Sequence, residues 1–133
     1  GFGVDSVPPH LTTREFLAAV RRILTPQGIV LGNVWGRSVN RLYDSMVKTY
    51  RTVFESLLVV DVVGSGNKIL VAMPTKRQIR DDELVERARR VARKLELRHD
   101  LVEIAQRNVR APGEDGANGK LLTDAEVGAA PAR

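Results

Sequence analysis

The residues best suited to chemistry fall in two short segments near the start of the chain. Asp5 stands in the loop D-S-V-P-P-H, and Asn33 and Trp35 end a short apolar run. A carboxylate can bind a cationic amine and accept its proton, while a carboxamide can both donate and accept hydrogen bonds. Pro8 and Pro9 could add a stiff apolar wall. Each also has a structural alternative, because Asp forms turns and Asn satisfies loop backbone.

Two predicted elements would bring these segments together. The apolar spacing of residues 12–24 predicts a helix, and Thr12 with Glu15 matches a T-x-x-E capping box at its start. The run G-I-V-L-G-N-V-W at 28–35 favours a strand covered on both faces, as in a parallel sheet. Ligands of such sheets bind at the carboxyl ends of strands. We therefore expect the Asp5 loop and Asn33 to be neighbours at one edge.

The following residues predict a helix and then a hairpin. Residues 38–54 have helical spacing with Ser38 as the cap, and residues 57–63 and 68–73 are apolar and strand-like. The intervening G-S-G-N could suggest a phosphate loop. A nucleotide loop joins a strand to a helix, however, whereas this segment joins two strands. The pattern therefore favours a β-hairpin.

Composition limits the remaining possibilities. The 133 residues fit one domain that is large enough to form a core without covalent cross-links. The absence of cysteine excludes disulfides and thiolate metal sites. Neither histidine has acidic companions at metal-ligand spacing, so we expect no metal. A charged amphipathic helix is predicted at 81–97, inside the basic range 76–110. Such a helix is either a solvated face or a surface for nucleic acid or anionic lipid.

The motifs D-S-V-P-P-H-L-T-T-R-E-F-L and L-T-P-Q-G-I-V-L-G-N resemble the C-terminal part of the spermidine synthase (polyamine aminopropyltransferase) family. The resemblance implies an α/β fold: the C-terminal half of a Rossmann-like, methyltransferase-type three-layer sandwich that ends in an antiparallel β-hairpin. Residues 1–80 would form this part and 81–108 a basic helical extension, while the linker-like composition of 109–133 predicts a disordered tail. Near the end, G-K-L-L-T-D-A-E resembles the L-T-D-D of a methyltransferase-like branch.

The resemblance implies transfer of an aminopropyl group from decarboxylated S-adenosylmethionine to a polyamine such as putrescine. The enzyme would be cytoplasmic and homo-oligomeric, without a metal and without a membrane or nucleic-acid partner. Asp5 matches the second acid of the family's D-x-x-D loop, with catalytic and substrate-binding roles, and Asn33 takes the position of a substrate-binding Gln beside Trp35. The residues implied at the cofactor are Ser6, Val7, Pro8, Pro9, His10 and Leu11.

The chain also departs from the family pattern. Phe2 stands three residues before Asp5, where the family has its first acid, and the glycine-rich cofactor loop would lie upstream. We therefore expect a fragment of a longer enzyme that is inactive alone. A methyltransferase-like or non-catalytic relative stays open, as does a basic nucleic-acid-binding module. The latter is less favoured because no aromatic residue interleaves with the cations of 76–110.

Overall fold

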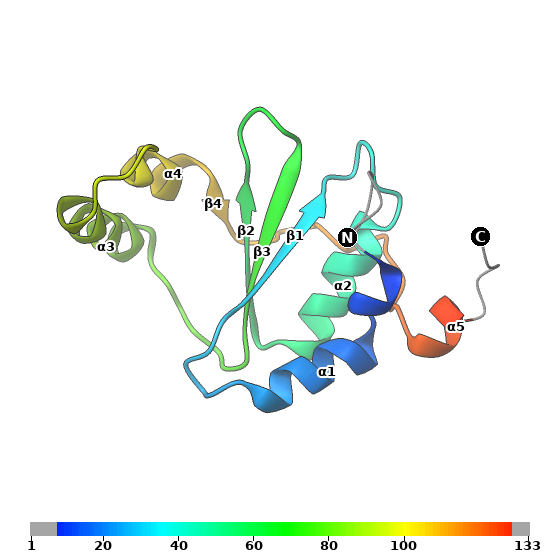
Figure 1. Ribbon diagram of the computed structural model, residues 1–133. Helices are drawn as coiled ribbons and strands as arrows, with labels where there is room; N and C mark the ends of the chain where they lie inside the picture. The colour runs from blue at the N-terminus through cyan, green and yellow to red at the C-terminus, as the bar shows by residue number, and fades with distance from the viewer. Residues whose placement is uncertain (1–7, 129–133) are drawn as a thin grey trace.

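A computed structural model describes residues 8–128, which form a mixed α/β structure around a four-stranded sheet (Figure 1). The elements are η1 (Pro9–Leu11), α1 (Arg14–Ile23), β1 (Val30–Trp35), α2 (Tyr43–Val53), β2 (Ser56–Asp61), β3 (Asn67–Met73), α3 (Asp81–Lys94), α4 (Leu101–Arg107), β4 (Val109–Arg110) and α5 (Asp124–Gly128). Among these elements, no helix is both long and apolar enough to span a bilayer.

The order of strands in the sheet is β1-β3-β2-β4. Strand β3 is antiparallel to both of its neighbours, so β1 and β2 run parallel to each other and are joined through α2. The α/β class and the terminal hairpin predicted from the sequence are therefore confirmed. In the turn between β2 and β3, Gly64 and Gly66 have φ of 86° and 77°, a conformation that suits glycine.

One face of the sheet carries the hydrophobic core. Helices α1 and α2 pack together (Figure 1). Their apolar side chains belong to one core cluster with those of the strands. Val34, Val59 and Leu70 are almost fully buried on this face. Gly32 lies on the same face, where an added Cβ would stand 2.5 Å from the Tyr50 hydroxyl oxygen. The unusual glycine in this strand therefore makes room for a packed helix.

The other face and one edge of the sheet are less covered. Side chains alternate along β1, so Leu31, Asn33 and Trp35 lie opposite the core-facing residues, and Leu31 is 68% exposed. Within residues 8–128, β1 pairs with β3 alone, which leaves its outer edge without a hydrogen-bonding neighbour. The sequence predicted a strand buried on both faces, but α1 and α2 cover only one.

The start of α1 differs from the predicted capping box. Thr13, rather than Thr12, caps the helix by accepting a hydrogen bond from the Phe16 N–H. Thr12 instead donates its hydroxyl proton to the Pro9 carbonyl. Glu15 accepts a hydrogen bond from the backbone N–H of Asp124. The pattern T-T-R-E offers two threonines as candidate N-caps. Glu15 binds the distant Asp124 N–H, so its carboxylate does not complete a local capping box.

The start of α2 was also predicted too early. The helix begins at Tyr43, and Ser38 lies in the preceding turn instead of capping it. Asn40 holds this turn, because its side chain donates to the Trp35 carbonyl and accepts from the Leu42 N–H. A side chain that binds neighbouring backbone in this way competes with helix formation.

Residues 109–128 are folded, although their composition predicted a disordered tail. Strand β4 pairs with β2, and the segment that follows crosses α2. Leu122 is 7% exposed and belongs to the core, and its N–H donates to the Thr49 hydroxyl. Gly119 lies so close to Asp44 that any Cβ would overlap its backbone. The glycines that resemble a linker therefore permit close packing.

Candidate active site

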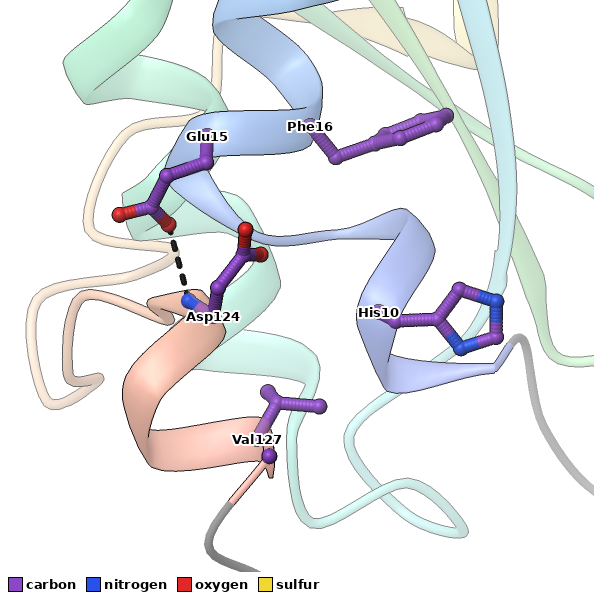
Figure 2. Close-up of a pocket in the computed structure, with 6 residues that line it drawn as sticks. His10, Glu15, Phe16, Asp124 and Val127 are labelled. Atoms are coloured by element: carbon purple, nitrogen blue, oxygen red, sulfur yellow. Dashed lines mark hydrogen bonds between the residues drawn. The ribbon is translucent and has the colours of Figure 1, made fainter.

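A hollow lies where η1 and the start of α1 meet α5 (Figure 2). His10 from η1 and Glu15 and Phe16 from α1 line it together with Asp124 and Val127 from α5. The backbone N–H of Asp124 donates to Glu15 Oε1 at 2.9 Å and joins two segments that are 109 residues apart. The structure thus brings the loop that carries the family resemblance against the L-T-D-A-E segment.

The chemistry of this hollow is acidic and partly apolar. The hydrogen bond from the Asp124 N–H stabilises the Glu15 carboxylate and lowers its pKa from the ordinary value. Asp124 adds a second carboxylate, and Phe16, which is 38% exposed, supplies an apolar surface. Figure 2 shows the rings of Phe16 and His10 extending to the same side in this view. Arg14 pairs with Glu15 Oε2 at 3.2 Å, so the carboxylate of the hollow that is open to a cation is that of Asp124, beside the apolar ring of Phe16.

The predicted cofactor loop is only partly within the described residues. Asp5, Ser6 and Val7 lie outside them. Pro8 and Leu11 are half-buried, whereas Pro9 and His10 are exposed. The Leu11 N–H donates to the Pro8 carbonyl, and Pro9–Leu11 forms the short helix η1, so the loop has a defined conformation. Of the four predicted cofactor residues that the structure describes, His10 lines the hollow.

The predicted substrate residues Asn33 and Trp35 lie on the less covered face of β1. Asn33 is exposed, and its side-chain oxygen accepts a hydrogen bond of 2.9 Å from the Asn67 side chain. Trp35 is half-buried and lies opposite Asn67 in the register of β1 and β3. Asn67 therefore orients the carboxamide of Asn33, a partnership between strands that the sequence analysis missed.

A charged cluster lies beyond the end of β1 and was also missed. Arg37 binds Asp44 through two hydrogen bonds of 2.8 Å, and Arg37 also approaches Asp115. The bond from Arg37 lowers the pKa of Asp44 to about 2. The Asp44 carboxylate also accepts the Gly116 N–H, which ties α2 to the C-terminal segment.

Asp115 and Asp61 complete the cluster. Asp115 accepts the Tyr43 hydroxyl at 2.7 Å and Arg110 at 2.9 Å, while Asp61 accepts Arg110 and Lys68. Burial alone would raise the pKa of each carboxyl, but these hydrogen bonds outweigh it and the pKa of both lies below the usual range. Arg37, Lys68 and Arg110 each pair with a carboxylate of the cluster, which leaves no unpaired cation in it to bind an anion. The bonds to Asp115 also hold the C-terminal segment against β4 and α2.

Metal ligands do not gather in the described residues. Within 8–128, no group of three or more His, Asp or Glu side chains is placed to hold a metal ion.

Comparisons with known proteins give three partial matches. The chain is 35% identical over 75 residues to a polyamine aminopropyltransferase of Vibrio vulnificus, a match that covers 56% of this chain and 24% of that protein. It is 32% identical over 94 residues to the eEF1A lysine and N-terminal methyltransferase of Homo sapiens, covering 70% of this chain and 13% of that protein. The protein of that name from Bos taurus is 33% identical over 88 residues, 65% of this chain and 12% of the relative.

The matched relatives are all transferases, and the matches span at most about a quarter of their length. No family model matches the chain, and no solved structure matches it.

Proposed function

We propose that this chain is the C-terminal part of a transferase that moves an aminopropyl group from decarboxylated S-adenosylmethionine to a polyamine such as putrescine. The observation that carries the proposal is the 35% identity to a polyamine aminopropyltransferase over 56% of the chain. The strand order β1-β3-β2, with an antiparallel strand between two parallel ones, supports the same fold family.

The proposed reaction forms one bond and breaks one. The neutral amine nitrogen of the polyamine attacks the aminopropyl carbon, and the carbon–sulfur bond breaks with its electron pair going to sulfur. The product is a neutral thioether, so the leaving group needs no acid. The nitrogen must lose a proton, because a protonated amine has no lone pair with which to attack. In this proposal a carboxylate on the opening loop holds the amine and accepts that proton, and Asp5 is the available acid.

The described residues contribute binding and orientation. Asn33 presents a carboxamide on the uncovered face of β1, and its hydrogen bond from Asn67 limits rotation of the amide. A fixed amide can direct its remaining hydrogen-bonding capacity at a substrate without losing rotational entropy on binding. The hollow lined by His10, Glu15 and Asp124 adds the carboxylate of Asp124 beside η1, which favours a cationic substrate over an anionic one.

The test is product formation by the intact protein from which the chain derives. The protein is incubated with putrescine and decarboxylated S-adenosylmethionine, and spermidine is measured by mass spectrometry. Asn33→Ala should lower kcat/KM at least about tenfold, and Asn67→Ala should lower it less, because it removes only the orientation. Asn118→Ala, an exposed asparagine in the C-terminal segment, is the matched control. Full activity of Asn33→Ala would reject the role of this residue, and absence of spermidine would reject the reaction.

Methyl transfer from S-adenosylmethionine is the second candidate. It is favoured by the matches to the two eEF1A methyltransferases, which cover 70% and 65% of this chain and so extend further than the match to the aminopropyltransferase. Parallel incubations with S-adenosylmethionine and candidate protein substrates separate the two reactions. A methylated product without spermidine would select this candidate, and neither product would indicate a non-catalytic relative.

A further inference from the structure

Helices α3 and α4 form a helical hairpin that stands apart from the main core. Figure 1 shows them on the β4 side of the sheet, away from α1 and α2. The two helices pack on each other, and α4 leads directly into β4. Ala88 is the one buried residue of α3, and Ala105 is the one buried residue of α4. Leu84, Leu101 and Ile104 are half-buried, so part of their apolar surface stays accessible.

The hairpin carries an open groove with an apolar floor. Val91 from α3 and Leu101 and Ile104 from α4 line this floor around Ala88 and Ala105. Val91 is 41% exposed, and Leu95, one helical turn further along the chain, is 54% exposed. Exposed apolar side chains that adjoin one another in a groove, unlike scattered ones, are typical of an interaction site.

The rim of this groove is cationic. Arg87 and Val91 line both the floor and an adjoining hollow, which Arg90 and Lys94 complete. Arg87 forms an ion pair with Glu83 at 2.9 Å. Within residues 8–128, Arg90 and Lys94 form no ion pair. The rim thus presents positive charge that the described part of the chain does not neutralise.

We propose that the α3–α4 groove binds an acidic amphipathic helix of a protein partner. Such a helix would place apolar side chains, spaced three and four residues apart, on the floor, with its carboxylates facing Arg90 and Lys94. Charge complementarity selects an acidic partner and speeds its association. A single nucleic-acid strand fits less well, because the range 76–110 has no aromatic residue on which bases could stack. The inference does not depend on the transferase reaction.

The experiment uses the intact protein and a synthetic probe. The probe is a fluorescent helical peptide of about 18 residues, or five turns, with Leu along one stripe and Glu on the flanks. A scrambled peptide of the same composition, a single-stranded DNA oligonucleotide and phosphatidylserine vesicles are measured in parallel. Binding is followed by fluorescence anisotropy for the soluble probes and by co-sedimentation for the vesicles.

A charge-matched pair of double variants locates the site. Arg90→Glu with Lys94→Glu should weaken peptide binding at least about tenfold, since it reverses the charge of the rim. Arg89→Glu with Arg93→Glu changes the net charge equally at positions that do not line the groove, and it should change binding less than about threefold. Circular dichroism of both variants verifies that the helices are retained.

Several outcomes would overturn the proposal. Equal binding of the scrambled peptide would show that charge alone acts, and equal weakening by both double variants would show that the groove is not the site. Tighter binding of the oligonucleotide or of the vesicles would assign the surface to that partner class. No binding of the amphipathic peptide to the intact protein would show that the groove is not an accessible site of this kind.

Discussion

Replacing Gly116 by alanine tests whether the C-terminal segment is held against α2 as the structure shows. Gly116 has φ of 91°, and a Cβ there would stand 2.9 Å from the backbone nitrogen of Lys48. Adopting a left-handed conformation costs alanine about 1 kcal/mol, and overpacking against backbone adds about 1–3 kcal/mol. Gly113 provides the matched control, because its φ is 57° but a Cβ there would meet nothing within 4 Å. Its replacement should cost about 1 kcal/mol from backbone strain alone.

Hydrogen exchange measures this effect at the place where it acts. The N–H of Lys120 donates to the Ser45 hydroxyl and that of Leu122 to the Thr49 hydroxyl, both at 3.0 Å. These two amides are protected only while the segment is docked on α2. A loss of about 2–4 kcal/mol corresponds to exchange that is faster by about 30-fold to 1,000-fold in Gly116→Ala. Gly113→Ala should accelerate it only about fivefold.

Two results would contradict this packing of the C-terminal segment. If both variants accelerate exchange to the same extent, backbone strain explains the change and the close approach to α2 is wrong. If the Lys120 and Leu122 amides exchange freely before any substitution, residues 109–128 do not pack as the structure shows.

Three further perturbations test the core, the charged cluster and the open edge. Leu122→Ala should lower the free energy of unfolding by about 2–5 kcal/mol, because the residue is 7% exposed and belongs to the core. Urea denaturation measures this loss, and a value under about 1 kcal/mol would contradict the packing. Asp44 has a pKa of about 2 in the folded state, below its ordinary value of 3.8. Its ionised carboxylate therefore stabilises the fold fully above about pH 4, and this contribution is lost as the pH falls toward 2. Asp44→Asn should flatten acid unfolding in this window, and an unchanged profile would show that its bond to Arg37 does not stabilise the fold. The 133-residue chain alone should self-associate through the unpaired edge of β1. Leu31→Lys should reduce that association, as measured by light scattering. A chain that is already monomeric without the substitution would contradict association through this edge.

The elements of the fold were predictable because their signals are local. Apolar spacing located α1, α2 and α3, and the two apolar runs around G-S-G-N located β2, β3 and their turn. The order β1-β3-β2 was not contained in that spacing. Placing β3 between two parallel strands depends on pairing residues such as Gly32 with Leu70, which lie far apart in the chain.

The candidate site divides in the same way. The sequence identifies Asn33, Trp35 and His10 as candidate site residues, and the family resemblance implies their roles. The approach of His10 to Asp124 and the bond between Asn33 and Asn67 required the folded chain. No spacing rule relates residues more than 30 positions apart, because such contacts arise when separate elements pack.

The C-terminal segment shows most clearly why composition was an incomplete guide. Its glycines and charged residues are typical of a linker when taken singly. In the fold, Gly116 and Gly119 allow close contact with α2, and Asp115 accepts hydrogen bonds from Tyr43 and Arg110. Local sequence specifies which backbone conformations and charges are available at each position. Whether those glycines become flexible joints or tight contacts depends on the surface that faces them, and that surface is assembled from the rest of the chain.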